Sequence, residues 1–412
     1  MPPDAYSAIE GFVDARHRDQ VDMLRRLVQV PTDNPPGDCA PHAEMAAGLL
    51  ERLGLTVERH PVPDELVRRN GMISATNLIV RHRFGPGPVI ALNAHGDVVP
   101  PGQGWTKDPY AGDVEGGRMY GRGVAVSKSD FATYAYALLA LKALGQDLGG
   151  AVELHLTYDE EAGGAIGPGW LLSEGLTRPD YALSAGFSYG VVTAHNGCLH
   201  MEIRVRGRIA HAALPATGHD ALEAATGVLD ALYAYRKELG AKRSGIVGIE
   251  SPTLVVGLIK GGVNTNVVPD LVSLRLDRRL IPEEEGATVE REVRAVIAAA
   301  VAGRDGISCE VERIMLAQPL TPLPGSEGLS DALARHGARL FGEPIRVHGV
   351  PLYTDARHYA AAGVPTVLYG AGPRTILEAG AHGGDENLCL EDLRRATCVV
   401  ASAVYDLLGG HT

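Results

Sequence analysis

The sequence predicts an α/β protein in which a domain with a mostly parallel sheet is interrupted by a ferredoxin-like insertion. Three observations support this prediction. Residues 6–184 alternate between helical spacing and short apolar runs, which is the order of a parallel sheet with crossover helices. Residues 197–315 change to the order β-α-β-β-α-β. After residue 316 the alternating pattern returns, so the outer domain comprises residues 1–196 and 316–412.

The outer domain begins with two predicted helices separated by a proline-rich turn. Residues 6–30 carry an apolar stripe at helical spacing, residues 31–37 read PTDNPPG, and residues 40–53 form the second helix. Strands are expected where short apolar runs occur, at 56–59, 77–81, 89–92, 151–157 and 180–184. The chain closes with a helix at 390–408.

The segment Ser127-Lys128-Ser129-Asp130 fits the S-x-x-D/E capping pattern and precedes an Ala/Leu/Tyr-rich stretch. We therefore predict a helix over 131–144 that is capped by Ser127. In the insertion the expected elements are a strand (199–205), a helix (220–239), two strands (253–258 and 266–276), a helix (283–301) and a strand (307–314).

Composition excludes several classes of protein. The chain has 412 residues, 45% of them hydrophobic, and a formal charge of −12, which disfavours nucleic acid as a partner. The first residues lack the pattern of a secretory signal and no apolar run reaches membrane-spanning length, so a cytoplasmic protein without a membrane partner is expected. Five scattered cysteines form no C-x-x-C pair and are interpreted as buried free thiols.

The chemistry is expected where the run 88–92 ends in His95-Gly96-Asp97. Two residues apart on a strand end, the His and Asp side chains project from the same face. This arrangement suits a metal ligand together with the carboxylate that orients it. A pair of carboxylates, Glu160 and Glu161, ends a second predicted strand, where adjacent side chains can diverge.

These motifs, with Trp105, Asp108-Pro109 and Gly121-Arg122-Gly123, resemble the M20 family of metallopeptidases and amidohydrolases over almost the whole chain. That family includes acetylornithine deacetylases, succinyl-diaminopimelate desuccinylases, aminoacylases and carboxypeptidase G2-like enzymes. The resemblance implies a catalytic domain (1–196 and 316–412), a lid and dimerisation domain (197–315), a homodimer and a small-molecule substrate.

The resemblance also implies roles for individual residues. His95, Glu161 and His382 correspond to metal ligands, Asp97 to the carboxylate that supports His95, and Glu160 to the general base. His211, in a G-x-x-A-H-x-x-x-P segment, corresponds to an oxyanion donor that usually comes from the neighbouring subunit. The positions that correspond to contacts with a carboxylate-bearing substrate are Asn264, Arg279 and Arg357.

Two positions depart from the family pattern. Val126 stands where the bridging Asp belongs, and Gly186 stands where another acidic ligand belongs. Neither side chain has a lone pair, so a two-zinc centre is not expected, and His95, Glu161 and His382 are predicted to hold at most one zinc. Asp130, Asp159 or His195 could supply a replacement ligand, but a structural role in a helix start or a turn is the commoner explanation for each of them.

Three functions remain open at this stage. The first is a one-metal hydrolase of an amide bond in a small substrate that carries a carboxylate. The second is a metal-free enzyme, performing cyclisation, isomerisation, elimination or hydrolysis, with Glu160 or His95 moving protons and Ser127 or Lys128 filling the metal positions. The third is a non-catalytic protein that binds a small molecule. We rank them in this order, because Asp97, Glu160, Glu161, His211 and His382 are all present.

Overall fold

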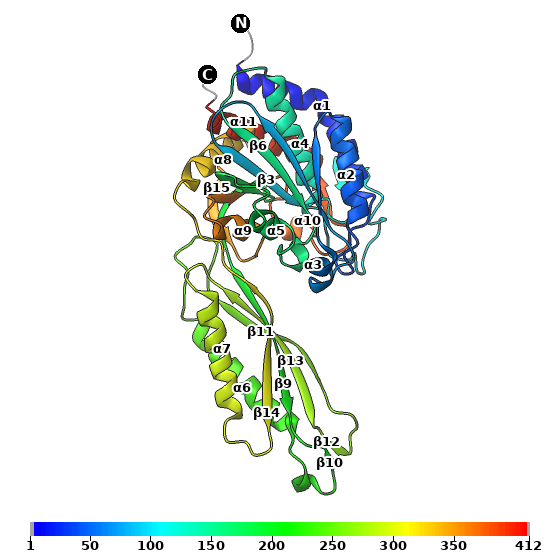
Figure 1. Ribbon diagram of the computed structural model, residues 1–412, viewed down its shortest axis with the longest axis vertical. Helices are drawn as coiled ribbons and strands as arrows, with labels where there is room; N and C mark the ends of the chain where they lie inside the picture. Colours follow the sequence, from blue (N-terminus) through cyan, green and yellow to red (C-terminus); the bar gives the residue numbers. More distant parts are fainter. Residues whose placement is uncertain (1–3, 410–412) are drawn as a thin grey trace. The chain divides into compact units, whose positions relative to one another are not determined.

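The computed structural model describes residues 4–409, so Met1, Pro2 and Pro3 of the segment inspected for a signal lie outside the described residues. The chain forms two compact units (Figure 1). Unit 1 comprises residues up to 193, 322–348 and from 354 onward, and unit 2 comprises 194–321 and 349–353. The predicted fold class, an α/β protein with a large parallel-centred sheet and a ferredoxin-like part, is confirmed.

Unit 1 is built on an eight-stranded sheet in the order β1-β2-β6-β3-β7-β16-β8-β15. Its centre is parallel, since β3 pairs in parallel with β6 and β7, and β7 with β16. Its flanking strands β1, β2 and β8 pair antiparallel. The strand bounds are β1 Val57–Pro61, β2 Thr76–Arg83, β3 Val89–His95, β6 Ala151–Thr157, β7 Tyr181–Ser184, β8 Gly190–His195, β15 Arg346–Val350 and β16 Thr366–Leu368.

Helices and a small sheet complete unit 1. The three-stranded sheet has the order β17-β5-β4, made of Asn387–Cys389, Arg118–Tyr120 and Asp113–Glu115. The helix bounds are α1 Ala5–Val28, α2 Ala40–Arg52, α3 Asp64–Arg69, α4 Lys128–Ala143, α5 Pro168–Ser173, α8 Ser326–Phe341, α9 Ala356–Ala361, α10 Ile376–Ala379 and α11 Leu390–Leu407. Helix α4 is buried along nearly its whole length, because it packs on β3 and β6 with α1 and α11 beside it.

The capping role predicted for Ser127 is wrong. Helix α4 starts at Lys128, and Ser127 precedes it without making a side-chain capping hydrogen bond. The Ser127 hydroxyl instead donates to the carbonyl oxygen of His95 and accepts from its amide, both at 3.0 Å. The hydroxyl therefore bonds to the backbone of His95 at the end of β3 and does not cap the N-terminus of α4.

Unit 2 contains the β-α-β-β-α-β order predicted for the insertion. The elements are β9 Gly197–Arg206, α6 Ala221–Leu239, β11 Thr253–Gly261, β13 Leu271–Leu280, α7 Gly286–Val301 and β14 Ser308–Ala317. They form an antiparallel sheet in the order β11-β13-β9-β14, supplemented by short β10 Ala210–His211 and β12 Val267–Val268. Alternate β9 side chains such as Leu199, Met201 and Ile203 belong to the apolar core of unit 2.

The cysteines differ in burial. None of the five forms a disulfide, as predicted, but only Cys39, Cys198 and Cys398 are buried, whereas Cys309 and Cys389 are half-buried. The interpretation of all five as buried thiols is therefore wrong for two of them. Cys309 lies on a strand with one face open, and Cys389 lies at the end of β17. Among residues 4–409, no helix combines the length and apolar character needed to cross a bilayer.

Candidate functional site

Two of the predicted site motifs lie together at one edge of the large sheet. His95 is the last residue of β3, and Glu160-Glu161 form a single 3-10 turn, η1 Glu160–Ala162, shortly after β6. Strands β3 and β6 are parallel, with His95 opposite Thr157. Because the carboxyl ends of neighbouring parallel strands share an edge, the fold brings the His and the Glu pair together, where α/β proteins commonly bind ligands.

The buried Asp97 carboxylate organises this edge. Its Oδ1 accepts a hydrogen bond from the Glu160 amide at 3.2 Å, and its Oδ2 accepts one from the Glu161 amide at 3.1 Å. The side-chain amide of Asn34 also donates to Oδ2, at 3.0 Å. Asp97 Oδ1 lies 3.4 Å from His95 Nδ1. One carboxylate therefore fixes both the histidine and the backbone that carries the two glutamates.

His95 and Glu160 form the first pair of titratable groups. His95 Nε2 lies 3.9 Å from Glu160 Oε2, and both side chains are largely buried. Burial and the neighbouring Glu161, Asp355 and Asp97 carboxyls raise the pKa of Glu160 well above its usual value, although His95 acts in the opposite direction. Burial opposes protonation of His95, but Glu160 and Asp97 outweigh it and raise the pKa of the imidazole well above its usual value. This pair can hold a proton and pass it between the imidazole and the carboxyl.

Glu161 and His382 form the second pair. His382 Nε2 lies 3.3 Å from Glu161 Oε1, and the hydrogen bond with this carboxyl raises the pKa of His382. His382 sits in a loop with φ +60, and its side chain is 56% exposed. The structure thus brings the predicted C-terminal histidine to the same Glu-Glu turn as His95.

Asp355 is a further residue of this site, and its sequence context alone does not identify it. It immediately precedes α9 and is buried, and its pKa is raised to about 6, chiefly by burial, while nearby His95 lowers it. Its Oδ2 accepts a 3.4 Å hydrogen bond from Thr157, and its Oδ1 is buried without a hydrogen-bond partner. The Thr354-Asp355-Ala356-Arg357 motif was the available signal, but the sequence does not show that the Asp carboxyl is close enough to His95 for the two charges to interact.

Arg122 and Glu386 form a buried ion pair that supports the site and that the sequence does not predict. The Arg122 guanidinium donates to Glu386 Oε2 at 2.6 Å, and both side chains are almost fully buried. Arg122 also donates to the carbonyl oxygens of Pro101 and Gly383, and Glu386 Oε1 accepts from the Ala125 amide at 3.0 Å. This ion pair ties the Gly-Arg-Gly loop to the loop that carries His382.

Replacing Arg122 with methionine is expected to destabilise the fold by about 3–5 kcal/mol, because it leaves the Glu386 carboxylate buried without its cation. Urea unfolding of the purified variants measures this change. Arg68→Met is the matched control, since the Arg68–Asp64 ion pair is exposed and its loss should cost less than about 0.5 kcal/mol. Equal midpoints and equal slopes for the two variants would contradict the role given to Arg122.

The structure shows the surroundings of the two positions that depart from the family pattern, Val126 and Gly186. Val126 is apolar and half-buried. A Cβ atom added at Gly186 would lie 2.8 Å from the Tyr369 amide nitrogen and 2.9 Å from a backbone carbon of Leu368, so this position has no room for a side chain. Nearby Asp130 is buried and accepts from the Ala371 amide at 2.7 Å, and its pKa is raised to about 7, chiefly by burial.

Lys128, Asp159 and His195 each have hydrogen-bond partners of their own. Burial lowers the pKa of Lys128 to about 8, and its Nζ donates to the Val30 carbonyl oxygen at 3.0 Å. Asp159 is buried, and its Oδ2 accepts from the Ile166 amide at 2.7 Å. His195 belongs to unit 2, where its Nδ1 lies 2.9 Å from the Asn196 carbonyl oxygen.

The residues considered for substrate contact belong to different units. Arg357 is in unit 1 and donates to the Gly163 carbonyl oxygen. Asn264 is in unit 2, exposed, and accepts from the Thr265 amide at 2.7 Å. Arg279, also in unit 2, donates from Nε to Asp277 Oδ1 at 3.0 Å and stacks over the Tyr353 ring.

His211 lies on β10 in unit 2 and is exposed. Its Nδ1 accepts a hydrogen bond from the Ala213 amide at 3.0 Å. In a neutral imidazole the proton must then be on Nε2, so this nitrogen can act as a hydrogen-bond donor.

Unit 1 places donor groups suited to a cation around His95. Asp97, Glu160, Glu161 and Asp355 place four carboxyl groups around His95, and one carboxylate oxygen of Asp355 is buried without a partner. Two histidines and one carboxylate are a ligand set that zinc accepts, although the ligand atoms of His95, Glu161 and His382 do not all lie within 4.8 Å of one another in this structure. The positions of Val126 and Gly186 provide no donor for a second ion.

Comparison with known proteins gives consistent matches. Residues 91–406 match the model of peptidase family M20/M25/M40. A succinyl-diaminopimelate desuccinylase of Rhizorhabdus wittichii is 31% identical over 68% of this chain and 72% of its own length. An acetylornithine deacetylase of Edwardsiella ictaluri is 31% identical over 84% of this chain and 85% of its own length.

Solved structures show the same fold. The structure of an M20 family metallo-carboxypeptidase from Sulfolobus solfataricus superposes with a TM-score of 0.75 at 16% identity. The match covers 95% of this chain and 98% of that one. At this level of identity the likeness concerns the fold.

Proposed function

The chain belongs to peptidase family M20/M25/M40, and on that premise we propose that it hydrolyses an amide bond in a small substrate that carries a carboxylate. Two relatives are named as a desuccinylase and a deacetylase, which supports an N-acyl amino acid as the substrate class, and a third is named as a probable carboxypeptidase, which supports a small peptide. The observation that carries the proposal is the buried Glu160, held by Asp97 through its amide and placed beside His95.

In the proposed reaction Glu160 accepts a proton from the attacking water and passes it to the leaving amine. A carboxyl whose pKa is raised by burial holds a proton more readily than an exposed one, which suits a group that must both take and give this proton. Asp97 fixes the position of Glu160 through the backbone, so the carboxyl needs little reorganisation.

His211 is proposed to donate from Nε2 to the oxyanion, as its hydrogen-bonded Nδ1 permits. We include in the proposal that the chain acts as a homodimer and that this histidine comes from the second protomer. Arg279, Arg357 and Asn264 stay candidates for the substrate carboxylate, and the expected cytoplasmic location stays a prediction.

His95, Glu161 and His382 are the residues that we propose to hold at most one zinc. When bound, such an ion polarises a carbonyl oxygen and lowers the pKa of water. Four surrounding carboxyl groups support the binding of a cation, and the lack of a ligand atom at Val126 and Gly186 supports one ion rather than two.

The proposal is tested with protein purified without chelator. Turnover of N-succinyl and N-acetyl amino acids and of dipeptides is measured with and without added zinc, and metal content is compared between the wild type and His382→Ala. We expect turnover of at least one of these classes, dependence on zinc, and a loss of about one zinc per chain in the variant.

Other results would change the proposal in defined ways. Full turnover after chelation, with equal metal content in both proteins, would replace it with a metal-independent enzyme on the same fold. Tight binding of an N-acyl amino acid without any turnover would show a binding protein instead.

A further inference from the structure

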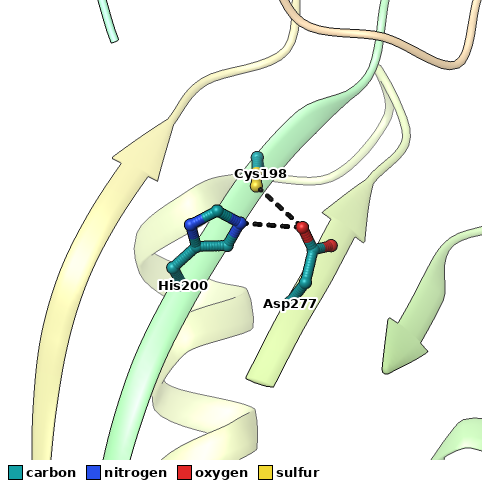
Figure 2. Close-up of side chains that lie close together, drawn as sticks. All are labelled: Cys198, His200 and Asp277. Atoms are coloured by element: carbon teal, nitrogen blue, oxygen red, sulfur yellow. Dashed lines mark hydrogen bonds and ion pairs between the residues drawn. The ribbon is translucent and has the colours of Figure 1, made fainter. Parts of the chain in front are cut away.

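Unit 2 contains a second cluster of possible ligands, shown in Figure 2. Cys198 and His200 lie on β9, and Asp277 lies on β13. Among residues 4–409 this is the single group of three His, Cys, Asp or Glu side chains whose ligand atoms all lie within 4.8 Å of one another. None of the three belongs to the site built around His95.

The strands fix this arrangement. Cys198 and His200 are two residues apart on β9, so their side chains project from the same face of the sheet. That face lies opposite the one where Leu199 and Met201 join the apolar core. Asp277 is directly across from His200 in the antiparallel register, so its side chain is on the same face.

The spacing of the donor atoms is close to that required by a shared ion. Cys198 Sγ lies 3.6 Å and His200 Nε2 lies 2.7 Å from Asp277 Oδ2. Around a tetrahedral zinc ion, bond lengths of ~2.0–2.3 Å separate such donors by ~3.4–3.6 Å. The sulfur–oxygen pair already has this separation, and the imidazole would have to move by only ~0.7 Å to reach it.

The surroundings of Asp277 orient it for this task. Its Oδ1 accepts from Arg279 Nε at 3.0 Å, which leaves Oδ2 directed at Cys198 and His200. Carboxylates that bind metals are commonly held in this way by a hydrogen bond to the other oxygen. A thiolate and a carboxylate supply two negative charges against the single positive charge of Arg279, so the group still favours a cation.

We propose that Cys198, His200 and Asp277 bind one divalent cation of the zinc class, with a fourth position open to water or another small ligand. The side chains of His200 and Asp277 are 33% and 29% exposed, which gives the ion a path from solvent, whereas Cys198 is buried. Thiolate, imidazole and carboxylate together select zinc or cobalt over magnesium or calcium, which prefer oxygen ligands only.

The test uses the full-length protein, stripped of metal and titrated with cobalt(II). A cobalt–thiolate bond gives a charge-transfer absorption in the near ultraviolet, and His95, Glu161 and His382 cannot produce it because they contain no sulfur. We expect this absorption to correspond to one cobalt–thiolate site per chain and to saturate by about two added cobalt ions per chain, because the site proposed in unit 1 takes up the other ion. It should disappear in Cys198→Ser and need roughly ten-fold more cobalt in Asp277→Asn.

Cys309→Ser is the matched control, since Cys309 is a half-buried thiol on β14 of the same sheet, and it should leave the absorption unchanged. Asp277→Asn changes a partly exposed side chain, so it tests the site even if the buried Cys198→Ser variant folds poorly. No thiolate absorption in the wild type, or equal absorption in Cys198→Ser, would show an ordinary His200–Asp277 ion pair beside a thiol. The readout does not depend on turnover, so it stands apart from the proposed hydrolysis.

Discussion

Glu160→Gln is expected to lower kcat by about 10²- to 10⁴-fold while KM and the urea midpoint stay close to those of the wild type. The amide has nearly the same shape as the carboxyl, and its backbone would still be held by Asp97. What it lacks is the capacity to take a proton from water. Steady-state kinetics on the best substrate of the N-acyl amino acid and dipeptide panel measures the change.

The pH profile links the loss to Glu160 itself. The pKa of this carboxyl is raised, in part by the negative charge of Asp355, so kcat/KM of the wild type should fall on the acid side at a pH well above 4.5. Removing that charge with Asp355→Asn lowers the pKa of Glu160 and should move this fall to lower pH. The exposed Glu174→Gln is the control that should change neither kinetics nor profile. Full turnover by Glu160→Gln would refute the role of the carboxyl.

The parts of the site that follow local patterns could be predicted from the sequence. His95 and Glu160 each end an apolar run, and parallel strands place such ends at one edge, which β3 and β6 confirm. His200 and Cys198 show the two-residue spacing of a strand face. Their partner Asp277 is 77 residues from His200, however, and only the register of β9 with β13 brings the two together.

The parts that depend on distant contacts could not be predicted. Arg122 and Glu386 are 264 residues apart, and no local feature shows that they form one buried ion pair. Ser127 illustrates the opposite error: its local sequence fits a helix cap, but the backbone of His95 offers the hydroxyl two hydrogen bonds. Local propensity fails where tertiary structure supplies a better partner.

His211→Ala is expected to lower kcat by about 10²- to 10³-fold with little change in KM, because the imidazole would donate to the oxyanion only as negative charge develops on it. The exposed ring sits on the short strand β10 and makes its hydrogen bond to the Ala213 amide locally. The urea midpoint should therefore change little. Kinetics on the same substrate panel, with urea unfolding as a check on the fold, measures both effects.

Mixing two inactive variants tests whether the histidine acts across a dimer. A protomer with Glu160→Gln retains His211, and a protomer with His211→Ala retains Glu160. If the histidine serves the partner's site, random re-association of equal amounts yields one complete site in half of the dimers, and thus about a quarter of wild-type turnover. If the histidine serves its own chain, no dimer contains a complete site and mixing restores nothing. Unmixed His211→Ala taken through the same dissociation and re-association should stay at its low rate.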